Sequence, residues 1–302
     1  MMITRMRVDG LVNNSVMNLL GAGNLFTTGR VIYVDSVTGS NGNTGLDPAF
    51  PLATIAQAQT NAKANKGDTV VIFPTHAETY TAAVTLSKAG VSYVGLGEGM
   101  NRPTITVNGT VDGFSITGAN VIIANIIFPA PVTDAQTADI NVAAAGAKIL
   151  NTYHIGSAGS ENKVDIITVA SGGHDLIVNG VRAYNTVVDC VSWLSLEAAV
   201  NRPIIANCVV MGQFSTGVLI DEATATLCTI TGNIFKNTKA ATAVVTFTTG
   251  NSTGVMDSNF CSGRHTTIAS NIVPGTGMDF NQNFVVEEAA LNGILIPVAD
   301  AD

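Results

Sequence analysis

The stretch NVIIANIIF, residues 120–128, carries an asparagine, Asn125, in the middle of an apolar run. A buried amide without hydrogen-bond partners costs about 1–3 kcal/mol, so such a residue needs a reason. Similar stretches recur along the chain, each with a central asparagine: LIVNGV, IIANCV, TITGNIF, VMDSNFC, DFNQNFV and, more weakly, KILNTY. We therefore expect the amide to be a repeated structural part.

The spacing of these asparagines predicts a solenoid. The steps between them are 26, 28, 28, 26, 26 and 24 residues, and the asparagines are Asn125, Asn151, Asn179, Asn207, Asn233, Asn259 and Asn283. A period in the twenties is typical of repeat proteins, in which each coil buries its apolar face only against its neighbours. The second position after every one of these asparagines is apolar.

A coil of about 26 residues with short β-type segments, turn residues and no sustained helical period predicts an all-β parallel β-helix. Its coils would stack about 4.8 Å apart. An asparagine at the same corner of each coil can adopt the left-handed conformation of a tight turn. Its amide can also bond to the amides above and below, so we expect the seven asparagines to form a ladder.

The chain has 302 residues, of which only 12% are charged, with a net charge of −8. An acidic surface repels phosphate backbones, which argues against nucleic acid as the main partner. The chain contains no run of eighteen apolar residues, so no membrane-spanning helix is predicted. An export signal needs an unbroken apolar core, and in the N-terminal stretch Asp9, Asn13 and Asn14 interrupt the apolar residues. No export signal is therefore predicted. The four cysteines form no CxxC pair and are interpreted as small buried hydrophobes.

The repeats NVIIANIIF, TITGNIFKN and GVMDSNFCSG resemble coils of the right-handed parallel β-helix (pectin-lyase-like) superfamily, of the kind found in bacteriophage virion decoration proteins and tail spikes. The preceding segment, which runs from VIYVDSVTGSNGNTG through PLATIAQAQ to GDTVVIFP, resembles the start of such proteins. Residues 1–29 and 286–302 lie outside the repeat, so an N-terminal arm and a tail are expected there. The resemblance covers about 30–285 and implies a right-handed β-helix over those residues. It also implies a helix at about 52–66 that caps the open end of the solenoid.

Four aspartates are the catalytic candidates if the chain is an enzyme: Asp139, Asp165, Asp189 and Asp221, with Glu222 beside the last. Hydrolases of this fold need two carboxylates about 5–9.5 Å apart. Asp139 and Asp165 each lie fourteen residues after an asparagine of the repeat, so we expect them on adjacent coils, one above the other. No motif fixes a base or a leaving-group acid, and the plainer interpretation is a solvated outer face. No catalytic, cofactor or metal site is therefore predicted.

Three isolated features have equally plain interpretations. The four histidines are far apart and out of phase with one another, which does not indicate a metal site. Trp193 could stack on a sugar ring but more often such a residue packs in a core. GLGEG, residues 95–99, has the glycines of a phosphate loop, but no helix follows it, which favours a turn between coils.

The function favoured is a bacteriophage virion structural protein, a trimeric capsid decoration (cement or head) protein assembled in the host cytoplasm. Its partners would be two further copies and a major capsid or tail protein, with cell-surface polysaccharide as another contact. The segment VVTFTT, residues 244–249, is expected to be an outer strand buried in the trimer. The alternative is a tail spike or a polysaccharide lyase or hydrolase, for which only one Trp and five Tyr are available. A bacterial adhesin or carbohydrate-binding module is the third hypothesis, disfavoured by the missing export signal.

Overall fold

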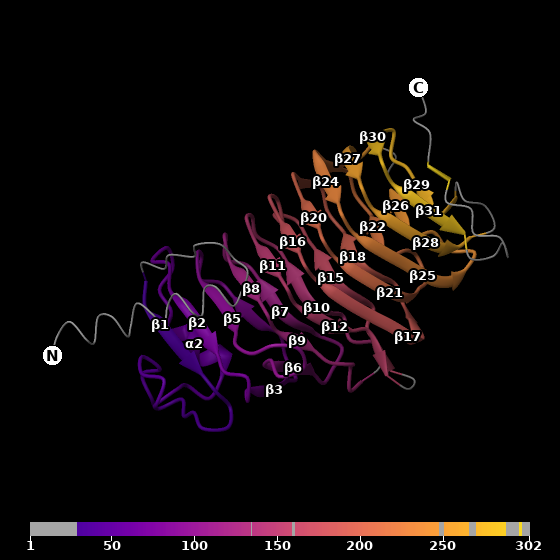
Figure 1. Ribbon diagram of the computed structural model, residues 1–302. Helices are drawn as coiled ribbons and strands as arrows, with labels where there is room; N and C mark the ends of the chain where they lie inside the picture. The colour runs from indigo at the N-terminus through magenta and orange to yellow at the C-terminus, as the bar shows by residue number, and fades with distance from the viewer. Residues whose placement is uncertain are drawn as a thin grey trace.

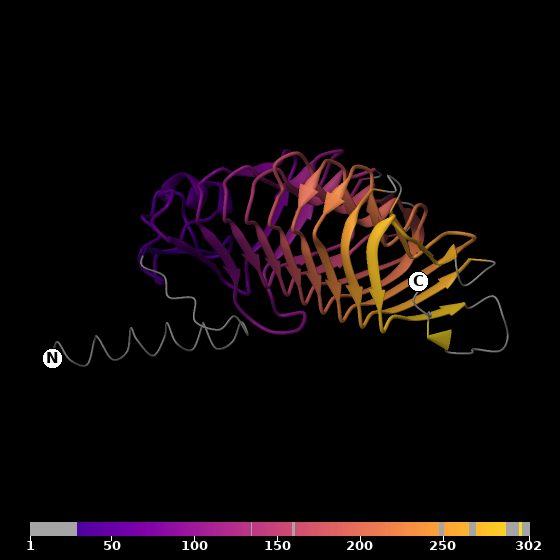
Figure 2. The same ribbon diagram turned by 90° about the horizontal axis from the view of Figure 1, so that it is seen from above.

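The computed structural model describes residues 29–133, 135–158, 161–247, 251–265, 270–287 and 296–297. Nearly all of the N-terminal arm and of the tail, which the sequence places at 1–29 and 286–302, lies outside these ranges. Within them the strands form one elongated stack, from the indigo end to the yellow end of the ribbon (Figure 1). The same stack seen from above has its first and last strands at opposite ends (Figure 2).

Three long sheets run along this stack, and each of the eight coils from β2 to β29 contributes one strand to each sheet. Sheet A contains, in order, β1 (Val31–Val34), β2 (Thr69–Ile72), β5 (Ser92–Gly95), β8 (Ile122–Ala124), β11 (Lys148–Leu150), β16 (Ile177–Asn179), β20 (Ile204–Ala206), β24 (Cys228–Thr231), β27 (Thr253–Asp257) and β30 (Gly277–Asn281).

Sheet B contains β3 (Ala77–Tyr80), β6 (Thr104–Val107), β9 (Ile127–Phe128), β12 (Tyr153–Ile155), β17 (Arg182–Cys190), β21 (Val209–Phe214), β25 (Ile234–Ala240), β28 (Phe260–Arg264), β31 (Phe284–Glu287) and β32 (Ile296–Pro297). Sheet C contains β4 (Val84–Leu86), β7 (Asp112–Ile116), β10 (Ala138–Val142), β15 (Asp165–Val169), β18 (Ser192–Leu196), β22 (Leu219–Asp221), β26 (Val245–Phe247) and β29 (Ile272–Val273).

Neighbouring strands in these sheets pair in parallel from coil to coil, and only β32 runs antiparallel to its neighbour, β31. The chain is a parallel β-helix. Two short pairs lie in the connections: β13 (Ser157–Ala158) with β14 (Glu161–Asn162), and β19 (Val200–Asn201) with β23 (Ala225–Thr226). The fold class predicted from the asparagine period is confirmed.

Equivalent apolar residues stack inside the solenoid. In sheet C the strand pairing places one buried residue of each coil directly above the next: Phe114, Ile140, Ile167, Leu194, Leu219 and Val245. Because each residue sits on its equivalents, no coil can bury its apolar side without its neighbours. Val244, Val245 and Phe247 belong to this core, so the prediction that 244–249 is an outer strand is wrong over 244–247. Residues 248–249 lie outside the described ranges.

A short helix, α2 (Ile55–Asn61), closes the N-terminal end of the core beside β1 and β4 (Figure 1). Thr54 caps it by accepting a hydrogen bond from the Gln57 N–H, and Ile55 and Ala58 enter the core. The prediction of a helix over 52–66 is too long, because Ala62 has extended backbone angles and Gly67 has a φ of 71°. In the part of the chain described, no helix is long and apolar enough to cross a bilayer.

The corner between sheets A and B explains the recurring asparagines, but in three registers rather than one. The left-handed position of the successive corners is filled by Asn125, Asn151, Gly180, Asn207, Gly232, Ser258 and Gln282. Asn179 lies one residue before this position, whereas the last three asparagines of the repeat lie one residue after it. Because side chains alternate along an extended chain, a shift of one residue changes where the amide points.

The amide hydrogen bonds split the expected ladder into three groups, and one of these groups, Asn179 with Asn207, joins two different registers. Asn151 Nδ2 donates to Asn125 Oδ1 (3.1 Å), and Asn207 Nδ2 donates to Asn179 Oδ1 (3.2 Å). The third group is buried and continuous: Asn233 Nδ2 donates to Asn259 Oδ1 (2.8 Å), and Asn259 Nδ2 donates to Asn283 Oδ1 (2.9 Å).

Candidate functional site

Asp139 is buried at the centre of a polar cluster inside the solenoid. Its Oδ2 accepts hydrogen bonds from Lys163 Nζ (2.7 Å) and from His154 Nδ1 (2.8 Å), and its Oδ1 accepts one from Gln136 Nε2 (2.9 Å). Burial raises the pKa of Asp139, but the Lys163 charge and these hydrogen bonds outweigh it and hold the pKa below its usual value. Asp139 is therefore an ionised partner of a buried cation, not a free acid.

His154 extends this cluster toward the corner between sheets A and B. Its ring stacks on Phe128, with centroids 4.8 Å apart, and its Nε2 lies 2.8 Å from Thr152 Oγ1. Burial lowers the pKa of His154, which favours the neutral ring, with Nδ1–H donated to Asp139 and Nε2 accepting from Thr152. The order Thr, His, Asp is that of a nucleophile, base and orienting acid, but Thr152 is only 1% exposed. The cluster is thus sealed within the core.

Asp165 is the candidate acid with the most perturbed environment. It is 6% exposed, and Ser192 Oγ donates a hydrogen bond to its Oδ1 (2.6 Å). Burial raises the pKa of Asp165 to about 6, and the charges of Glu197 and Glu222 act in the same direction, against the Ser192 hydrogen bond. A carboxyl group with such a pKa can act as an acid near neutral pH.

Asp139 and Asp165 do not lie one above the other, and that prediction is wrong. Asp165 pairs with Ser192, and Ile167, two residues later, pairs with Ile140, so Asp165 stands level with Ala138. The shift arises because the connection from the asparagine corner to sheet C is one residue longer in the coil of Asp165. A fixed count from the asparagine therefore does not give the register.

The remaining two candidates lie elsewhere. Asp221 is buried at the end of β22, at the level of the core residue Leu196, and its carboxylate accepts a hydrogen bond from Ser252 Oγ. Asp189 lies in β17, in sheet B, and its side chain is outside the described set. Asp139, Asp165 and Asp221, the three predicted acids whose side chains are described, are not brought together at one site.

Four carboxylates on or beside sheet C interact electrostatically: Asp112, Asp165, Glu197 and Glu222. Glu197 follows β18 and Glu222 follows β22 on the next coil, where Leu196 pairs with Asp221. Burial raises the pKa of Glu197, with Glu222 and then Asp112 adding to the shift, so these carboxylates repel one another. The sequence analysis named Asp165 and Glu222 but missed Glu197 and Asp112. Aligning SLE (195–197) with IDE (220–222) would have found Glu197.

Among the described residues, no group of three or more His, Cys, Asp or Glu side chains is placed to hold a metal ion. His76 Nε2 lies 3.1 Å from Glu78 Oε2, and His174 Nδ1 accepts the Asn201 N–H. Trp193 is fully buried and packs against Phe235, with ring centroids 5.6 Å apart. It is therefore a core residue, unable to stack on a sugar.

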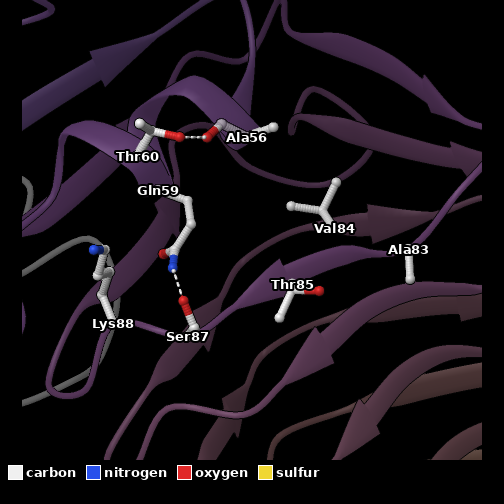
Figure 3. Close-up of a pocket in the computed structure, with 8 residues that line it drawn as sticks. All are labelled: Ala56, Gln59, Thr60, Ala83, Val84, Thr85, Ser87 and Lys88. Atoms are coloured by element: carbon white, nitrogen blue, oxygen red, sulfur yellow. Dashed lines mark hydrogen bonds between the residues drawn. The ribbon is translucent and has the colours of Figure 1, made fainter.

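Two pockets remain. The first, of about 420 Å³, lies between α2 and β4 (Figure 3). Its lining is short and mostly uncharged: Ala56, Gln59, Thr60, Ala83, Val84, Thr85, Ser87 and Lys88. Figure 3 shows Gln59 pointing toward Ser87, whose Oγ lies 3.1 Å from Gln59 Nε2. With Lys88 as the only charged group, this pocket offers no acid–base pair. The second pocket, of about 370 Å³, contains Arg102 and Arg182.

No known protein family and no curated protein matches the sequence. Among solved structures the chain is similar to a rhamnogalacturonan lyase, with 14% identity and a TM-score of 0.40 over 90% of this chain and 66% of the lyase. It is also similar to the pectate lyase Pel9A, with 14% identity and a TM-score of 0.45 over 88% of this chain and 77% of that one. A third structure is the GH136 lacto-N-biosidase from Eubacterium ramulus, with 8% identity and a TM-score of 0.29 over 84% and 67%. Likeness at this level concerns the general fold and carries no activity over to this chain.

Proposed function

We propose that this chain is a structural subunit of a bacteriophage particle, a β-helix that associates as a homotrimer and decorates the capsid surface. The proposal extends the sequence resemblance, and it is supported by the environment of the candidate acids and by an exposed apolar surface on sheet B. Three of the four candidate acids, Asp139, Asp165 and Asp221, accept hydrogen bonds from neighbouring side chains within the solenoid, which fits a structural role.

The supporting observation is an apolar column on the outer face of sheet B. It consists of Val209, Ile234, Phe260 and Phe284, which pair from coil to coil, so that they form one line along the solenoid. The last three are 39%, 38% and 46% exposed. Tyr184 and Met211, which are paired beside the column, are 48% and 36% exposed. An exposed apolar surface of this kind marks an interaction site.

A second copy of the same chain is the partner that this column fits best. The column is straight and repeats at the strand spacing of about 4.8 Å, and the same column on a parallel copy has the same repeat. Three solenoids packed side by side around a threefold axis would each cover one apolar column. A closed symmetric assembly would leave no such surface exposed to further copies.

Light scattering tests the association. We expect the mass of about three chains for the natural sequence and of one chain for an Ile234→Lys/Phe260→Lys double variant. Val255→Lys is the matched control, because Val255 is 36% exposed but lies in sheet A, so this variant should stay trimeric. A monomeric natural protein at high concentration would overturn the trimer. Absence of the chain from purified particles would overturn the virion role.

A polysaccharide hydrolase or lyase is the second candidate, and the raised pKa of Asp165 beside Glu197 and Glu222 favours it. Release of reducing ends or of unsaturated sugars from a panel of polysaccharides tests this function. An enzyme of this kind should lose its activity in Asp165→Asn and in Glu222→Gln. It should keep the activity in Asp175→Asn, because Asp175 lies in an exposed ion pair with Arg202. No cleavage in the natural protein would remove this candidate.

A further inference from the structure

Two arginines line the pocket of about 370 Å³ at the corner between sheets A and B. Arg102 lies just before β6 and Arg182 begins β17, and both line the pocket together with the turn 97–99 and the corner residues Asn125 and Asn151. The turn belongs to the GLGEG stretch, and it is tight: a Cβ at Gly97 would lie 1.7 Å from the Asn101 carbonyl oxygen.

Arg102 is held in place by the corner itself. Its Nε donates to the Gly99 carbonyl (2.7 Å), and its Nη1 donates to the Asn151 carbonyl (2.8 Å) and, at 3.4 Å, to Asn125 Oδ1. Asn125 is fixed in turn, because its Nδ2 donates to the carbonyls of Gly95 and Gly97, both at 2.9 Å. The guanidinium is therefore pre-organised, with Nη2 not used in these bonds.

Arg182 adds a second positive charge, and it forms no ion pair within the described ranges. Burial lowers the pKa of Arg102, and the positive charge of Arg182 lowers it further, so the two guanidinium groups repel each other. Within the described ranges no carboxylate lies within 4.0 Å of either guanidinium, and Arg182 donates no side-chain hydrogen bond. Glu98 lines the same pocket but forms no ion pair with them. Two like charges kept together without a counter-charge repel each other unless an anion joins them.

We propose that this pocket binds an oxyanion group, which Arg102 and Arg182 hold between them. Guanidinium groups present paired N–H donors that match the oxygens of a phosphate, sulfate or carboxylate, and they do so better than ammonium groups. The pocket is large enough to take a sugar-sized body attached to the anion. Arg182 pairs with Val209 of the apolar column, so the site lies at the N-terminal end of that column. The site does not depend on the proposed structural function.

Isothermal titration of the full chain with inorganic phosphate, sulfate and acetate, at constant ionic strength in sodium chloride, tests the proposal. We expect saturable binding of at least one of these anions. Arg182→Gln should weaken it about tenfold, because one charge-assisted contact is lost. Preference for phosphate or sulfate would indicate an ester group as the natural ligand, whereas preference for acetate would indicate an acidic sugar.

Two variants separate a built site from general charge effects. Arg264→Gln removes an exposed arginine from the same sheet and should leave the affinity unchanged. Glu98→Gln removes the carboxylate that lines the pocket and should tighten binding several-fold. The site is rejected if none of the three anions binds saturably, or if Arg264→Gln weakens binding as much as Arg182→Gln.

Discussion

Lys163 Nζ lies 2.7 Å from Asp139 Oδ2, and both side chains are buried between the coils of the solenoid. The ammonium group also donates to the Pro129 carbonyl (2.9 Å), so the cation ties the connection between sheets B and C to a strand of sheet C. In the sequence Asp139 was singled out only as a candidate acid, and Lys163 was not singled out at all. Their pairing is a property of the folded chain alone.

Removing one partner of this pair should be costly. Lys163→Met leaves the Asp139 carboxylate buried without its cation, and we expect a loss of about 3–5 kcal/mol in the free energy of unfolding. Because the pKa of Asp139 is lowered, the stability that the pair contributes is present above the ordinary aspartate pKa and is lost as the pH falls. Urea denaturation at pH 7 measures the loss.

The exposed ion pair between Arg202 and Asp175 provides the comparison for that experiment. Arg202→Gln should change the denaturation midpoint little, since surface pairs contribute little to stability. Equal shifts of the denaturation midpoint in Lys163→Met and Arg202→Gln would show that the buried pair contributes no more to stability than the exposed pair.

The three buried asparagines of the last coils should matter more than the exposed ones. Asn259→Ala removes the acceptor of Asn233 Nδ2 and the donor to the Ile230 carbonyl. Leaving such groups buried without partners costs about 1–3 kcal/mol each. Asn179→Ala, at an exposed corner, should cost much less. Thermal unfolding of the two variants compares them, and a larger effect at Asn179 would contradict the buried ladder.

Asp165 should make stability fall as the pH rises from about 4 to 6. Its pKa is raised to about 6 in the folded chain from 3.8, so the folded state binds more protons than the unfolded state within this window. The contribution present at low pH is lost as the pH passes the folded pKa, and it is on the order of 3 kcal/mol. Asp165→Asn should flatten this part of the curve of unfolding free energy against pH. An unchanged slope in that variant would show that other groups cause this pH dependence of stability.

The four cysteines should be inert in the folded protein. They are buried and unpaired, and burial raises the pKa of each thiol to about 12: Cys190, Cys208, Cys228 and Cys261. Only the thiolate reacts with Ellman's reagent. We expect no rapid reaction in native buffer at pH 8 and four equivalents after denaturation. Rapid release from the native protein would show that a thiol is accessible.

The sequence by itself determined the fold, because a solenoid repeats its pattern along the chain. The asparagine spacing and the apolar residues beside each asparagine predicted stacked coils and parallel strands, and the absence of a CxxC pair predicted buried thiols. The structure has all three. The left-handed corner requires glycine, asparagine or another tolerant residue in every coil, and that local requirement is visible in the chain.

Only the tertiary structure decided which residues meet. The connections between sheets differ in length from coil to coil, and a difference of one residue moves a side chain out of line with its expected neighbour. This is why Asp139 faces Lys163 instead of Asp165, and why the seven asparagines form three groups. It is also why Arg102 and Arg182, 80 residues apart in sequence, line one pocket. Register is set by how successive coils stack, and no single coil carries that information.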